Sequence, residues 1–117
     1  MNYRKMIVWQ KAMQLTEAAY MEIRKLPPEE LYALSAQMRR ALISIPSNIA
    51  EGAGRSTDNE LRHFMTIARG SVTELETQFM VAEMLGYLEH EDIEPIMNLL
   101  DEIRRMLSAL IKNGRVD

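Results

Sequence analysis

The sequence predicts an all-α protein, an antiparallel four-helix bundle with up-down-up-down topology. Apolar residues recur at spacings of three and four along the chain, and no stretch alternates with the period of two that marks a strand. Prolines and glycines divide this pattern into four segments joined by short loops. The 117 residues suffice for one domain with one hydrophobic core, and no cysteine is present to form a disulfide or bind a metal.

The first two segments are separated by a pair of prolines. We expect one helix over residues 3–26, which must end there because proline donates no backbone hydrogen bond. The second is expected over residues 28–51, with proline and two acidic residues in its first turn. Pro46 lies inside it and predicts a kink. The stretch Gly52-Ala53-Gly54 predicts its end, with Gly52 as a cap, since glycine accepts the left-handed conformation of a C-cap.

The third segment, residues 57–86, has the clearest start. Thr57 and Glu60 match a capping box, in which the threonine hydroxyl caps the helix and the glutamate reaches back. The fourth segment covers residues 91–113, and the basic residues in its last half suit the helix dipole. The short loops between all four segments make sequential helices antiparallel neighbours.

The helices carry more apolar side chains than one bundle interior needs. Nine lie beside or off the apolar stripes: Ile7, Trp9, Met13, Met21, Ile43, Met80, Met84, Leu99 and Met106. So many on all four helices indicate a second buried face, and we therefore expect a homo-oligomer.

Four short stretches are distinctive. They are VWQKA at residues 8–12, QMRRALISIPSNIAEG at residues 37–52, IARGSVTELETQ at residues 67–78 and LGYL at residues 85–88. Together they resemble the four helix bundle protein family, also called the 23S ribosomal RNA intervening sequence protein family. The resemblance covers residues 7–111, nearly the whole chain.

The resemblance implies a small bacterial protein with no established enzymatic activity, so we expect no catalytic residue and no cofactor. Known members are four-helix bundles, often homopentamers. The accessory variability determinant of diversity-generating retroelements has the same architecture, and its pentamer binds a reverse transcriptase and nucleic acid. The resemblance thus implies a homopentameric ring that acts as an adaptor for a partner protein, with structured RNA or DNA as a further ligand. The alternative is a protein-only partner in a retroelement, defence or toxin–antitoxin system.

Charge and hydropathy bear on location and on nucleic-acid binding. The apolar run at residues 6–9 is too short for a signal peptide or a membrane span, so we expect a cytoplasmic protein. The net charge is −3, but residues 74–102 hold nine acids and no lysine or arginine, whereas residues 39–70 hold five arginines. A basic face would bind phosphates. Its candidate residues are Arg39, Arg55, Arg62 and Arg69. The alternative is that charges on adjacent helices offset one another, which the scarcity of aromatic residues favours.

Four charged residues lie beside or between core-facing positions: Arg40, Glu51, Glu74 and Glu76. We interpret them as structural ion pairs between the second and third helices, since a partly buried arginine needs a carboxylate. The hypothesis pairs Arg40 with Glu74 or Glu76 and directs Arg40 inward, which makes Arg39 the better phosphate ligand. Loss of such a buried pair in Arg40→Ala would cost a few kcal/mol.

A metal-binding bundle is the least favoured alternative. Glu60 and His63 form one E-x-x-H motif, but di-iron bundles need two such motifs and two further carboxylates. Glu60 is also assigned to the capping box, and we place His90 in a loop. We therefore expect no metal site.

Overall fold

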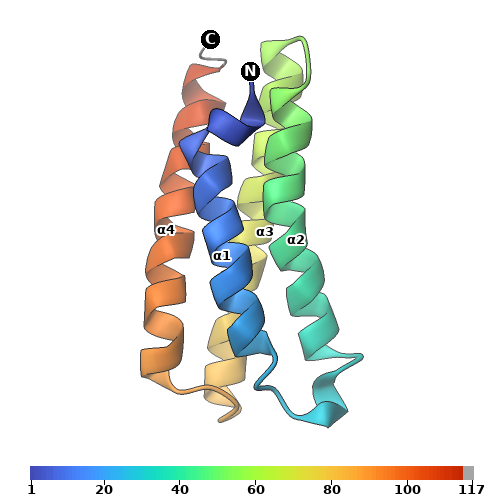
Figure 1. Cartoon of the computed structure of the whole chain (residues 1–117), viewed down its shortest axis with the longest axis vertical. Coiled ribbons are helices and arrows are strands. Elements are labelled where there is room, and N and C mark those ends of the chain that lie inside the picture. The colour runs from blue at the N-terminus through green and yellow to red at the C-terminus, as the bar shows by residue number, and fades with distance from the viewer. Residues whose placement is uncertain (115–117) are drawn as a thin grey trace.

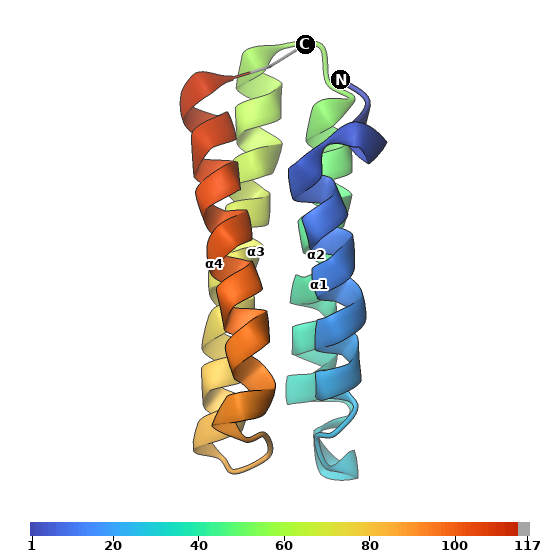
Figure 2. The same ribbon diagram turned by 60° about the vertical axis from the view of Figure 1, so that its left-hand side comes forward.

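Four long helices packed side by side make up the computed structural model, which describes residues 1–114 (Figure 1). They are α1 (Ile7–Ile23), α2 (Leu34–Ala53), α3 (Asp58–Met84) and α4 (His90–Asn113), with short 3₁₀ turns at Tyr3–Lys5 and Pro28–Glu30. Each helix packs against the next, and α1 also packs against α4, which closes the bundle (Figure 2). No strand occurs in the described part of the chain. The predicted all-α four-helix architecture is confirmed.

Two helices, α1 and α2, begin several residues after their predicted first residues. The prediction that the second helix starts at Pro28 is wrong, because Pro28–Glu30 forms a 3₁₀ turn and Ala33, at φ −119° and ψ −105°, leaves the helical region. α2 then starts at Leu34, whose backbone N–H donates to Glu30 Oε1 at 3.3 Å. α1 likewise follows a separate turn at Tyr3–Lys5 and ends at Ile23.

Side chains cap the starts of α3 and α4. Thr57 Oγ1 accepts from the Glu60 backbone N–H at 3.2 Å, as predicted, but the Glu60 carboxylate bonds the Thr57 hydroxyl at 2.9 Å instead of the backbone. At α4 the Glu89 backbone N–H donates to Asp92 Oδ2 at 3.3 Å, and the Asp92 backbone N–H donates to the Glu89 backbone oxygen at 3.1 Å. His90 is therefore the first residue of α4, and its predicted place in a loop is wrong.

Gly52 does not end its helix. α2 continues to Ala53, and its C-cap, Gly54, has a right-handed φ of −83°. The left-handed glycines are Gly86 after α3 (φ 80°) and Gly114 after α4 (φ 77°). α2 continues through Pro46 as one unbroken helix. The kink predicted at Pro46 concerns the direction of the helix axis, and it stays a prediction.

One apolar core runs the length of the bundle, and all four helices contribute to it. Leu15, Leu42, Leu75 and Leu100, one from each helix, are fully buried. The surplus apolar residues lie outside this core. Ile7, Met13, Met21, Ile43, Met80 and Met84 are 44–76% exposed, whereas Trp9, Leu99 and Met106 are half-buried. None of the helices within residues 1–114 is long and apolar enough to cross a bilayer.

Candidate functional site

α2 and α3 pack closely together, and the candidate site lies on the surface that these two helices form. Ser44 on α2 and Ser71 on α3 share a hydrogen bond, with 2.9 Å between the hydroxyl oxygens. Asn48 Nδ2 holds Ser44 in place by donating to its backbone oxygen at 2.8 Å and to its hydroxyl at 2.9 Å. Toward the end of α2, a Cβ added at Gly52 would lie 2.8 Å from Phe64 Cβ. Gly52 therefore serves close helix contact, a role that the sequence pattern did not reveal.

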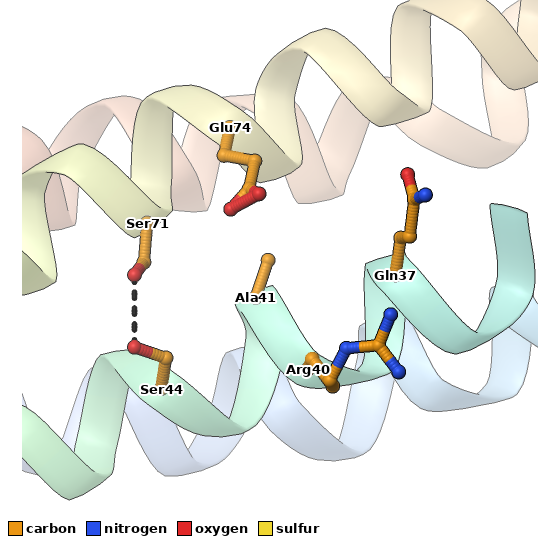
Figure 3. Close-up of a pocket in the computed structure, with 6 residues that line it drawn as sticks. All are labelled: Gln37, Arg40, Ala41, Ser44, Ser71 and Glu74. Atoms are coloured by element: carbon orange, nitrogen blue, oxygen red, sulfur yellow. Dashed lines mark hydrogen bonds between the residues drawn. The ribbon is translucent and has the colours of Figure 1, made fainter.

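A polar pocket opens along this helix pair (Figure 3). Its lining residues are Gln37, Arg40, Ala41, Ser44, Ser71 and Glu74. The serine pair and Ala41 line it with small side chains, and the Glu74 carboxylate extends over Ala41 (Figure 3). The Arg40 guanidinium extends along α2 toward Gln37 and away from Glu74 (Figure 3). The pocket thus carries one cation and one anion that do not meet.

The predicted ion pairs of Arg40 are not found. Arg40 and Glu74 are both exposed, and neither forms a salt bridge among residues 1–114. Glu76 is paired instead with Arg104 of α4, at 3.6 Å from Nε to Oε1. The prediction was wrong because α3 turns Glu76 toward α4 and not toward α2.

Glu51 does form an ion pair, but within its own segment. Arg55 Nη2 lies 2.6 Å from Glu51 Oε1, and Arg55 Nη1 lies 3.8 Å from Glu60 Oε2. The Arg55 guanidinium also lies 4.9 Å from the centroid of the Phe64 ring. These contacts fasten the turn between α2 and α3.

The four arginines proposed as phosphate contacts do not form one surface. Arg39 and Arg55 lie near opposite ends of α2, about 24 Å apart at 1.5 Å per residue. Arg62 and Arg69 both turn toward α4, where they donate to Ile111 O at 2.9 Å and to Ser108 Oγ at 3.3 Å. All four are therefore engaged by other groups of the protein.

We predicted that Arg40 points inward and that Arg39 is the more accessible of the two, and the structure shows the reverse. Arg39 is half-buried, and its Nη2 donates to the Leu31 backbone oxygen at 3.1 Å. Arg40 is exposed. Arg40 is thus the more accessible cation of the two, since consecutive helical residues point about 100° apart.

Charge is separated along the long axis of the bundle. The N-terminus, the last turn of α4 and the turn between α2 and α3 lie at one end of the bundle (Figure 1). That end has an excess of two basic residues, with Arg4, Lys5, Arg55, Arg62 and Lys112 against Glu51, Asp58 and Glu60. The opposite end holds the connection from α3 to α4, where residues 83–94 contain five acids and no lysine or arginine. The uneven charge of the sequence becomes a basic end and an acidic end.

Hydrogen bonds at the acidic end shift two pKa values. Tyr87 Oη donates to Glu30 Oε2 at 2.8 Å, which raises the pKa of Tyr87 above its ordinary value. The hydrogen bond to Glu22, at 2.7 Å, raises the pKa of Lys25, and the Asp92 carboxylate at 3.6 Å adds to this while burial opposes it. These contacts tie the loops to the helix ends.

Both residues of the E-x-x-H motif contact other side chains in this structure. Glu60 bonds Thr57 and Arg55, and the exposed His63 ring packs edge-on against Phe64 with 5.2 Å between centroids. Residues 1–114 contain no group of three or more potential metal-ligating side chains. Glu83 and Glu94 lie near His90, but they contact different ring nitrogens, Nδ1 at 3.4 Å and Nε2 at 3.7 Å, so the three side chains do not converge on one point.

The fold and this surface define an all-α bundle protein with a polar groove between two of its helices. The chain belongs to the 23S rRNA-intervening sequence protein family, whose model matches residues 4–109. A solved structure with the same fold is a protein with unknown function from the S23 ribosomal protein family of Bacteroides thetaiotaomicron. It shares 22% sequence identity and a TM-score of 0.82, over 92% of this chain and 100% of that one. No curated protein matches the chain.

Proposed function

We propose that this protein is a non-enzymatic adaptor that assembles into a homo-oligomer, with a homopentameric ring favoured, and binds a partner protein. The observation that carries the proposal is the set of large apolar side chains exposed on the helices. Ile7, Met13, Met21, Ile43, Met80 and Met84 lie on α1, α2 and α3 and are at least 44% exposed. Exposed apolar side chains in this number favour protein contacts, and flexible methionines adapt to them.

We place both this protein and its partner protein in the cytoplasm. A reverse transcriptase is the partner that the sequence resemblance implies. A protein of a defence or toxin–antitoxin system is the alternative, and it would use the same apolar surfaces.

Structured RNA or DNA is the second class of ligand in this proposal. The basic end supports it, because Arg4, Lys5 and Lys112 are exposed there and basic residues outnumber the three acids Glu51, Asp58 and Glu60 of the same end. A ring of parallel copies would place several such ends together, and their fields would add. Phosphate binding can therefore occur in a protein whose net charge is −3.

Light scattering at two salt concentrations, with and without a structured 23S rRNA fragment, tests the proposal. We expect a stable oligomer that binds the RNA more weakly at high salt. The double variant Arg4→Glu, Lys112→Glu should bind at least tenfold more weakly at low salt. Arg24→Glu, near the acidic end, is the matched control and should reduce binding much less.

The two halves of the proposal fail separately. A protein that stays monomeric at every concentration would refute the assembly. An oligomer that ignores RNA at low salt would refute the nucleic-acid half and leave the protein partner.

A further inference from the structure

We propose that the α2–α3 surface around the polar pocket is a contact between copies of this chain, in which Arg40 of one copy pairs with Glu74 of the next. The inference rests on the proposed assembly and identifies the surface that forms it. The charge and shape of this surface and the symmetry of an assembly support this contact.

The charges on this surface are complementary to a second copy. Arg40 and Glu74 come from opposite sides of the pocket, and the described part of the chain gives neither a salt bridge. Their neighbours are already engaged: Arg39 binds the Leu31 carbonyl, and Glu76 pairs with Arg104. One cation on α2 and one anion on α3 are thus left for an outside partner.

The shape of this surface permits close approach. Ala41, Ser44 and Ser71 are small, and the serine hydrogen bond holds α2 and α3 together beneath the two charges. Exposed apolar side chains stand nearby on each helix, Ile43 at 46% and Ile67 at 39%. A second groove on the other side of α2 continues this surface past Ile43 to Tyr20. Apolar contact beside a charged pair is the usual make-up of a protein interface.

Symmetry decides which charges meet. When the symmetry axis runs parallel to the helices, α2 of one copy faces α3 of the next, and Arg40 meets Glu74. This holds for a two-fold dimer whose axis passes through this surface, and for a closed ring such as a pentamer when α2 and α3 form the two flanks by which neighbouring copies meet. A two-fold axis across the helices would instead place Arg40 against Arg40, which repulsion disfavours. The charge pattern therefore selects copies whose helices run parallel.

Charge exchange tests this pairing by light scattering. Arg40→Glu and Glu74→Arg each place like charges across the contact, and we expect each to weaken assembly at least tenfold. The double variant restores opposite charges and should assemble within about threefold of the wild type. Arg105→Glu and Glu91→Arg are matched controls on α4 with the same charge changes at exposed sites outside this surface, and they should assemble normally.

Circular dichroism of each variant confirms that the monomer still folds. Should a charge reversal prevent folding, Arg40→Gln and Glu74→Gln remove the attraction more gently and should still weaken assembly. Single variants with the wild-type molar mass would overturn the inference, and so would a double variant that stays dissociated. A wild-type protein that is monomeric would instead refute the proposed assembly itself.

Discussion

Gly52 of α2 lies so close to Phe64 of α3 that a Cβ on the glycine would be 2.8 Å from the phenylalanine Cβ. The second close atom, Met65 Cε, ends a flexible side chain and can move, but Phe64 Cβ is fixed to its helix backbone. Contact between the two helix backbones at this point therefore depends on the missing side chain.

Gly52→Ala should lower the free energy of unfolding. Overpacking of a tight contact costs about 1–3 kcal/mol, which exceeds the gain of up to about 1 kcal/mol in helix propensity. Gly54→Ala is the control, because a Cβ there would meet its nearest atom, Glu51 O, at 3.6 Å, an ordinary contact. Urea unfolding of both variants checks the prediction, and equal stability of the two would contradict it.

The hydroxyl pair Ser44–Ser71 should show an energetic coupling. Ser71→Ala removes one partner and is expected to cost about 0.5–1.5 kcal/mol, while Ser44 keeps its bond from Asn48. A double-mutant cycle with Ser44→Ala measures the interaction directly. Strict additivity of the two single changes would show that the bond contributes nothing.

Arg104 should contribute more to stability than its neighbour Arg105. Arg104 reaches Glu76 on α3 and also binds Asp101, and its side chain is 37% exposed. Arg105 contacts Asp101 on its own helix, and its side chain is 73% exposed. Arg104→Ala should cost up to about 1 kcal/mol and Arg105→Ala less than about 0.5 kcal/mol. Thermal unfolding at low and high salt measures both, and the cost of Arg104→Ala should shrink at high salt.

Tyr87 should make the stability fall at alkaline pH. The Glu30 carboxylate accepts a hydrogen bond from the phenolic O–H, so the pKa of Tyr87 is raised in the folded protein. Its contribution is present in full below the unfolded pKa of 10.0 and disappears as the pH rises through the folded pKa. Unfolding free energies of the wild type and Tyr87→Phe should therefore converge above pH 10.

Tyr32→Phe is the control for this pH dependence, because Tyr32 is 91% exposed. Its stability should follow the wild-type curve. Lys25 also has a raised pKa but is present in all three proteins, so the difference between their curves isolates Tyr87. A constant difference between wild type and Tyr87→Phe from pH 8 to pH 11 would contradict the assignment.

The sequence by itself determined the number of helices, their core-facing stripes and the start of α3. These features depend on local signals: the spacing of apolar residues, the punctuation by proline and glycine, and the cap formed by Thr57. The start of α4 was within reach too, since Glu89 and Asp92 have capping-box spacing. The start of α2 was not, because a proline followed by acids fits a 3₁₀ turn as well as an α-helix.

Only the tertiary structure decided which charged residues meet. Periodicity shows that a side chain lies beside the core, but the rotation and register of neighbouring helices select its partner. A step of one residue turns a side chain by about 100°, which separates the half-buried Arg39 from the exposed Arg40. The same rotation directs Glu76 to Arg104 on α4, leaves Glu74 without an ion pair among residues 1–114, and turns Gly52 toward α3.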